Sequence, residues 1–290
     1  MQFINPKTDF AFKKIFGSEQ SKGILISFLN SILYPDVLKI QDLEILNPYQ
    51  APKIRGVKDT YLDVKARLNS GELVIIEMQV LNVEGFEKRV LYNAAKAYSI
   101  QLGRGQSYSE LNPVIALTIT DFSMFAEIED YLSRFILKEQ SVLVDYPIAG
   151  LELVFVELPK FDRRLDELKT IAEKWIYFLC HAPDFEVVPE SMGQVVEIQQ
   201  AFEMANQAIL SKDELEELEH QLIFIQDQKG AVTRATKEAL KQGRKEGREE
   251  GILEGTRSIA LNMLRKQLPL ETIVEVTGLT IEEIEKIRTQ

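Results

Sequence analysis

The segment from Thr60 to Val80, TYLDVKARLNSGELVIIEMQV, constrains the fold more than any other part of the chain. In it, apolar and polar residues alternate through two successive runs, which is the pattern of a half-buried strand. Between the runs, Asn69-Ser70-Gly71 suits a three-residue loop, a type I turn followed by glycine in the left-handed region. The sequence therefore predicts a β-hairpin.

The length of this loop decides which residues of the two runs face each other. If the hairpin closes on Leu68 and Glu72, Asp63 lies opposite Glu77, with the two Cβ atoms roughly 5 Å apart. A two-residue loop would instead place Asp63 opposite Met78, and the two acids would lie on opposite faces of the sheet. A joint site for the two acids thus depends on the longer turn.

Two carboxylates at that separation repel each other unless a cation lies between them. Hard oxygen ligands favour Mg²⁺ or Mn²⁺, and such an ion can polarise a phosphodiester and lower the pKa of a bound water molecule. The alternative is a solvated hairpin face on which Asp63, Lys65, Arg67 and Glu77 pair across the strands. The pattern alone leaves both interpretations open.

The order of the parts favours the metal site. The sequence has an Asp, then a short loop, then Glu-x-Gln on the next strand, and then a helix that begins near Glu84. This order resembles that of the PD-(D/E)XK nuclease core. More closely, the chain resembles the Rpn family of recombination-promoting nucleases, also described as PD-(D/E)XK nuclease family transposases. The order and spacing of several segments are similar to that family: TDFAFKKIFG (8–17), LDVKA and VIIEMQV in the hairpin, FEKRVLYNAAKAYSIQLGRGQSYSELNPVIALTITDF (86–122), LELVFVELPKF (151–161) and a glycine-spaced tail that ends in LPLETIVEVTGLTIEEIEKI.

This resemblance implies a metal-dependent DNA endonuclease that hydrolyses phosphodiester bonds and is associated with recombination or a mobile element. It implies Mg²⁺ or Mn²⁺ as cofactor, Asp63 and Glu77 as metal ligands, and Gln79 at the position where the wider superfamily usually has Lys. A neutral amide can orient the attacking water but hardly stabilises developing charge. Lys65, two residues from Asp63 on the same strand face, either supplies that charge or pairs with a carboxylate at the surface.

The resemblance also matches Asp9 to the family's N-terminal acidic position, where it would be a further metal ligand or hold a metal-bound water. Helix chemistry also explains this acid by itself. Thr8 suits the N-cap of a helix, an acid in the first turn is stabilised by the helix dipole, and Gly17 is a typical helix end. Both interpretations of Asp9 stay open.

A helix is predicted from Glu84 to Leu102, with an apolar face for the sheet. That face consists of Phe86, Val90, Leu91, Ala94, Ala95 and Tyr98. A second face is a candidate for phosphate contacts, although a solvated flank is the commoner explanation of such a stripe. Together with one lysine of the first helix, the DNA-binding candidates are Lys13, Arg89, Tyr92 and Lys96.

Strands over 114–120 and 153–158 extend the hairpin into an α/β core with a mixed sheet, as expected for a restriction-endonuclease-like PD-(D/E)XK fold. We divide the chain into a nuclease domain (1–160), a helical extension (161–230) and a tail (231–290). The extension is predicted to hold helices at Arg164–Cys180, Met192–Leu210 and Asp213–Gln228.

The tail carries glycines at a four-residue period on a charge-dense segment: Gly243, Gly247, Gly251 and Gly255. Four glycines inside a helix cost roughly 4 kcal/mol relative to Ala. The segment is therefore either a frayed linker or a helix whose glycines let a second helix approach closely. From Leu270 to Thr289 the pattern predicts a helix, a turn at 277–279 and an acidic helix, which disfavours reading of a DNA groove. We expect the tail to mediate homo-oligomerisation.

Composition fits a soluble, cytoplasmic enzyme. No apolar run approaches the roughly 20 residues that a membrane span needs, and no secretory segment is present. The single Cys180 cannot form an internal disulfide, and no Cys/His cluster indicates zinc. The net charge of −11 is unfavourable for binding a polyanion, but residues 1–110 hold 14 Lys/Arg and 12 Asp/Glu, a balance of +2. We expect weak, salt-sensitive DNA binding.

Two other functional classes stay open. A non-catalytic DNA- or protein-binding accessory factor of a mobile element would keep the fold without cutting, and a helical scaffold protein would act through the tail. Low metal affinity without cleavage would favour the first. Tight self-association without DNA binding would favour the second.

Overall fold

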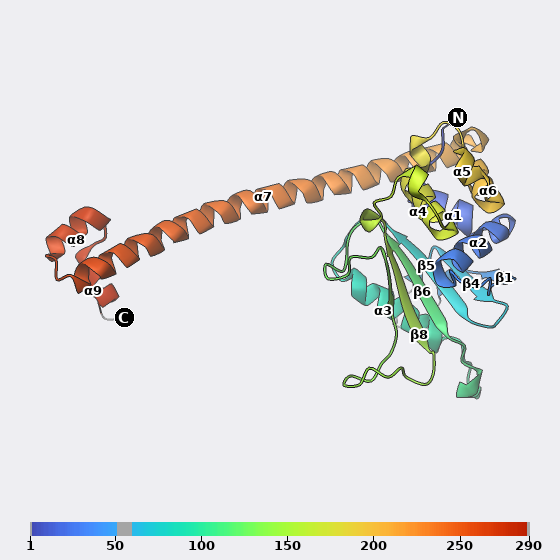
Figure 1. The fold of residues 1–290 in the computed structure, drawn as a ribbon, viewed down its shortest axis with the longest axis horizontal. Coiled ribbons are helices and arrows are strands. Elements are labelled where there is room, and N and C mark those ends of the chain that lie inside the picture. The colour runs from blue at the N-terminus through green and yellow to red at the C-terminus, as the bar shows by residue number, and fades with distance from the viewer. Residues whose placement is uncertain (1, 51–59, 289–290) are drawn as a thin grey trace. The chain divides into compact units, whose positions relative to one another are not determined.

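The computed structural model of the protein describes residues 2–50 and 60–288. The chain divides into two compact units, residues 1–226 and 227–290 (Figure 1). Within the described ranges, no helix combines the length and the apolar character that crossing a membrane requires.

The first unit is built on a six-stranded sheet in the order β1-β4-β5-β6-β8-β7. In that order the strands are β1 (Leu43–Leu46), β4 (Val64–Leu68), β5 (Leu73–Gln79), β6 (Val114–Thr120), β8 (Leu151–Glu157) and β7 (Leu132–Phe135). Strands β5, β6 and β8 are parallel, whereas the outer pairs are antiparallel. The predicted α/β fold with a mixed sheet is therefore confirmed. A separate two-stranded ribbon joins β2 (Tyr49–Gln50) to β3 (Thr60–Tyr61), just before β4.

Helices cover both faces of the sheet, which explains why its central strands are nearly continuous apolar runs. On one face lie α1 (Asp9–Phe16), α2 (Lys22–Leu33), α4 (Ile171–His181) and α6 (Val196–Met204), around a core that includes Phe16, Phe28 and Trp175. On the other face α3 (Phe86–Ser99) packs Ala94 and Ala97 against β5 and β6 (Figure 1). The hairpin face interpreted above as solvated is covered at Glu77, which contradicts that alternative there, whereas Arg67 is 51% exposed and pairs across the strands with Glu44.

The helix starts follow local chemistry. The Thr8 hydroxyl accepts a hydrogen bond from the backbone N–H of Ala11 at 3.3 Å, so Thr8 caps α1 as predicted, and Gly17 ends the helix. The Thr170 hydroxyl accepts from the N–H of Glu173, and the Glu173 carboxylate accepts from the N–H of Thr170, which is a capping box. This box starts α4 at Ile171, so the predicted start at Arg164 was too early.

Two further helix predictions need correction. In α3, Leu91 and Ala95 are exposed, and Asn93 and Lys96 are buried in the helix instead. Helix α7 (Lys212–Arg265) continues well beyond Gln228, where the sequence predicted its end. The remaining helical elements are α5 (Glu190–Gly193) and the short 3-10 turns η1 (Glu19–Ser21), η2 (Tyr108–Glu110), η3 (Leu158–Lys160), η4 (Leu165–Glu167), η5 (Ala182–Asp184) and η6 (Gln207–Ile209).

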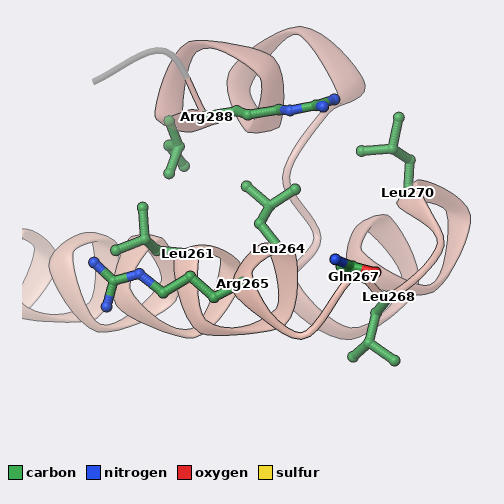
Figure 2. Close-up of a pocket in the computed structure, with 8 residues that line it drawn as sticks. Leu261, Leu264, Arg265, Gln267, Leu268, Leu270 and Arg288 are labelled. Carbon is green, nitrogen blue, oxygen red and sulfur yellow. The ribbon is translucent and has the colours of Figure 1, made fainter.

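The second unit consists of the later part of α7, α8 (Leu270–Thr277) and α9 (Ile281–Arg288). Gly278 adopts φ +69° and turns the chain between α8 and α9, so the predicted helix-turn-helix shape is confirmed, although Thr289 lies outside the described residues. A small core joins the three helices: Ala260, Ile273, Leu279 and Ile284. Leucines, Arg265 and Arg288 line a pocket between these helices (Figure 2). Its volume is about 420 Å³.

The four periodic glycines of the tail lie inside α7, which contradicts the frayed-linker alternative. In the described structure, nothing lies within 4 Å of a Cβ atom built at any of them. The glycine stripe is therefore open in this chain, and close approach of a second helix to it stays a prediction.

Candidate active site

The turn between β4 and β5 has the predicted three-residue form. The N–H of Leu68 donates to the carbonyl of Glu72 at 2.9 Å, and the N–H of Gly71 donates to the carbonyl of Leu68 at 2.9 Å. Gly71 adopts φ +100°, which a residue with a side chain would reach only with strain. Glycine at this position therefore sets the loop length and, through it, the register of the hairpin.

The register brings the two acids to adjacent strands. Val64 pairs with Ile76, so the next residues outward, Asp63 and Glu77, lie opposite each other as predicted. Asp63 stands in a bend directly before β4, where the ladder ends. Its Oδ2 accepts a hydrogen bond from the N–H of Met78 on β5 at 2.7 Å. The carboxylate thus replaces the backbone carbonyl that would accept this bond if β4 continued.

The Asp63 carboxyl lies against the start of α1. Its side chain is 17% exposed, and its Oδ1 lies 3.9 Å from Nζ of Lys13, which pairs with Asp9 at 2.7 Å. Burial has the largest effect on the pKa of Asp63. Together with the neighbouring Asp9 carboxyl, it outweighs the opposing effects of the Met78 N–H and Lys13 and raises this pKa to about 7.

Glu77 is the more deeply buried acid, with a side chain that is 11% exposed. The side-chain amide of Asn93 in α3 donates to its Oε1, and the guanidinium of Arg89 lies 3.8 Å from its Oε2. Burial raises the pKa of Glu77, although both of these neighbours favour its charged form. The Oδ1 atom of Asn93 is buried and has no hydrogen-bond partner among the described residues.

The amide of Gln79 is held at both ends. Its Oε1 accepts from Arg89 at 2.6 Å, and its Nε2 donates to the carbonyl of Leu81 at 2.7 Å. The Arg89 guanidinium also lies over the ring of Phe86, 5.0 Å from its centroid. Arg89 was predicted as a phosphate contact, but its position makes it a partner of Gln79 and Glu77.

The structure separates the remaining candidates. Lys13 lies beside Asp63, and Tyr92 is 40% exposed on α3. Lys96 is only 6% exposed, which argues against the phosphate contact predicted for it. Burial lowers the pKa of Lys65, the nearby charge of Arg67 lowers it further, and no ion pair joins Lys65 to Asp63 or Glu77.

Sequence reasoning missed Asn93. It is one turn after Arg89 on α3, between the buried positions Val90 and Ala97, and a polar residue in a buried helical stripe was the signal that could have identified it. The candidate site thus has two halves, Asp63 with Asp9 and Lys13, and Glu77 with groups from α3. Among the residues that the structure describes, no three His, Cys, Asp or Glu side chains are grouped closely enough to hold a metal ion.

Comparison with known families matches residues 6–235 to the model of the PD-(D/E)XK nuclease family transposases. This range includes the whole sheet and both halves of the candidate site. Comparisons with curated proteins and with solved structures found no match. PD-(D/E)XK nucleases generally use divalent metal ions. Since the match covers most of the chain, the protein belongs to the PD-(D/E)XK nuclease family transposases.

Proposed function

We propose that the protein is a metal-dependent DNA endonuclease that hydrolyses phosphodiester bonds in recombination or in the movement of a mobile element. The observation that carries this proposal is a pair of poorly solvated carboxyls, Asp63 and Glu77, on neighbouring strands of a PD-(D/E)XK chain. Both have a raised pKa, so each negative charge is unfavourable until a cation approaches.

The donor set suits Mg²⁺ or Mn²⁺. Asp63 and Glu77 would hold the ion, and the unpartnered Oδ1 of Asn93, on the amide that contacts Glu77, is a further hard oxygen close to the site. When bound, the ion would polarise the phosphodiester and lower the pKa of a water molecule. Asp63 would bind the ion in its deprotonated form, so its raised pKa makes metal binding depend on pH.

The other residues of the site would position groups and offset charge. Gln79, fixed by Arg89 and the Leu81 carbonyl, would orient the attacking water. Lys13 stands 3.9 Å from Asp63 and would offset negative charge that develops at the phosphate. Asp9 would hold Lys13 in place through their 2.7 Å ion pair.

The direct test is incubation of supercoiled plasmid with the purified protein and Mg²⁺, Mn²⁺ or EDTA. We expect nicked or linear DNA with either metal and intact plasmid with EDTA. DNA binding without cleavage under all three conditions would instead support the alternative, a non-catalytic accessory factor of a mobile element. That alternative is favoured by the absence, within the described residues, of a group of three potential ligands.

Metal binding is expected to depend on pH through Asp63. Because its pKa is raised from 3.8 to about 7, its contribution to stability is fully present below about pH 4 and is lost as the pH rises through about 7. Mn²⁺ binds the deprotonated form, so it should raise the Tm at pH 8 clearly more than at pH 5. Thermal denaturation followed by circular dichroism measures both effects.

Asp63→Asn is the matched variant for this experiment, since it keeps the shape of the side chain and cannot titrate. It should lose both the metal-dependent rise in Tm and its pH dependence. An equal rise in Tm at pH 5 and pH 8 in the unmodified protein would contradict the assignment of Asp63 as a metal ligand.

We also propose that the tail mediates self-association. Its unit has a small core and leaves large apolar side chains exposed, among them Ile252, Ile259 and Val276.

Truncation after Gln228 tests this role and keeps the contacts of α7 with α1, namely Lys14 with Glu214 and Phe10 with Gln221. Truncation is expected to shift sedimentation toward the monomer and to weaken cleavage of long DNA more than cleavage of short oligonucleotides, because two linked sites raise the effective concentration on long DNA. Identical sedimentation of the truncated and full-length proteins would exclude this role.

A further inference from the structure

A groove of about 370 Å³ adjoins the candidate active site within the first unit. One side is formed by Lys7 and Asp9, the floor by residues 78–81 at the end of β5, and the other side by His220, Phe224 and Ile225 of α7. Gln79 lines this groove as well as the active site. Its volume is at the lower end of the range for small-molecule pockets.

The wall contributed by α7 is held firmly on α1. The Gln221 side chain accepts a hydrogen bond from the N–H of Phe10 at 3.0 Å, and Lys14 pairs with Glu214 at 2.7 Å. Leu218 is buried in the main core. His220 and Phe224 are four residues apart, so they lie on one face of this anchored helix, toward the groove.

The charges in the groove are already paired. Lys7 pairs with Asp121 at 3.0 Å, and Asp9 pairs with Lys13 at 2.7 Å. A phosphate group would therefore find no free cation among these residues. The occupant that matches the groove is electrically neutral.

The rest of the lining selects a flat, mainly apolar group with polar edges. Met78, Val80 and Leu81 form an apolar floor, and the ring of Phe224 is 60% exposed beside them. The imidazole of His220 has no hydrogen-bond partner in the described part of the chain. Proteins bind nucleobases by stacking them on an aromatic ring and by hydrogen bonding to their edges. Phe224 and His220 offer both groups side by side.

We propose that this groove binds one unpaired nucleobase, stacked on Phe224, from the nucleotide next to the phosphate that is cut. The proposal rests on the proposed nuclease function, because it places the neighbouring phosphate at Gln79 and Asp63. A base inside a duplex cannot reach such a groove without leaving the stack. The preferred substrate is therefore DNA that is single-stranded or locally unpaired at the cut.

The test measures binding without catalysis. Full-length protein in EDTA is titrated into a fluorescein-labelled single-stranded 12-mer and into the matching duplex, and binding is followed by fluorescence anisotropy. Phe224→Ala should weaken single-strand binding roughly 10- to 100-fold, as loss of one stacked base does, and should affect duplex binding much less. Phe224→Tyr should keep most of the affinity, because it keeps the ring.

Ile223→Ala is the matched control, since Ile223 is the adjacent residue of α7, is 50% exposed and does not line the groove. It should bind both DNAs like the unmodified protein.

A single strand that contains 5-iodouracil should crosslink under ultraviolet light to the peptide that includes Phe224. Unchanged binding by Phe224→Ala, equal losses in Phe224→Ala and Ile223→Ala, or a crosslink confined to another region would each overturn the proposal. A protein that binds single strands through Phe224 but cuts neither plasmid nor single-stranded DNA with Mg²⁺ or Mn²⁺ would refute the nuclease function and leave the groove assignment standing.

Discussion

Replacing Asp63 by Asn, or Glu77 by Gln, is expected to lower the rate of Mg²⁺-dependent plasmid nicking by about three orders of magnitude or more. Each change removes one negative oxygen ligand, and a metal ion that stabilises transition-state charge contributes several kcal/mol, of which each 1.4 kcal/mol corresponds to about tenfold in rate. Single-turnover nicking at saturating Mg²⁺ measures the loss.

The amide variants are better probes than alanine. The sequence pattern placed both acids on a solvent-exposed strand face, but their side chains are only 17% and 11% exposed. Alanine would leave the N–H of Met78 and the amide of Asn93 without their acceptors, and a buried unpaired donor costs about 1–3 kcal/mol. A loss of activity in an alanine variant would then be mixed with a loss of stability.

Glu44→Gln is the matched control, because Glu44 is a 62% exposed acid on β1 of the same sheet and pairs with Arg67. It should nick plasmid at the full rate. Circular dichroism should show that all three variants keep their fold. Full activity in both Asp63→Asn and Glu77→Gln would remove the proposed metal site.

The hairpin was predictable because the signals that define it are local. Alternation with period two identifies the strands, and the glycine at position 71 fixes the loop length from within the loop itself. The cap of α1 by Thr8 is local for the same reason. These features place Asp63 opposite Glu77 before any tertiary contact is considered.

The surroundings of the acids were not predictable in the same way. Alternation separates two strand faces but does not tell which distant helix covers each face, so burial of Glu77 under α3 and its contact with Asn93 were missed. The helical pattern of α3 also left its rotation uncertain by about one residue, which exchanged Ala95 for Lys96 on the buried side. Non-local packing decided both outcomes.

The length of α7 shows a different limit. The sequence predicted a helix end at Gln228 and allowed either a frayed linker or a closely packed helix over the periodic glycines, yet one helix continues to Arg265. The residues between the glycines are mostly strong helix formers. Hydrogen bonds between side chains four residues apart, such as Gln242 with Glu246, add a little stability. The free-energy cost of the four glycines, taken by itself, therefore overestimated the tendency of this helix to unwind.

The positive charge that the superfamily usually supplies from the Gln79 position is expected to come from Lys13. Lys13→Ala should lower the single-turnover rate by roughly two to three orders of magnitude, as loss of a charge partner in the transition state does. Lys65 is two residues from Asp63 along the chain, but its side chain forms no ion pair with either acid, so Lys65→Ala should change the rate only a few-fold. A large loss in Lys65→Ala with full activity in Lys13→Ala would reverse the assignment.

Two further measurements separate a direct role of Lys13 from an indirect one. Lys13 also lowers the pKa of Asp63, so its removal could slow the reaction only by keeping Asp63 protonated. In that case the activity of Lys13→Ala would recover at pH 9, where Asp63 is ionised in any event. If Lys13 acts on the phosphate itself, the loss persists at pH 9, and the second change Gln79→Lys restores part of the rate, because it returns an ammonium group to the end of β5.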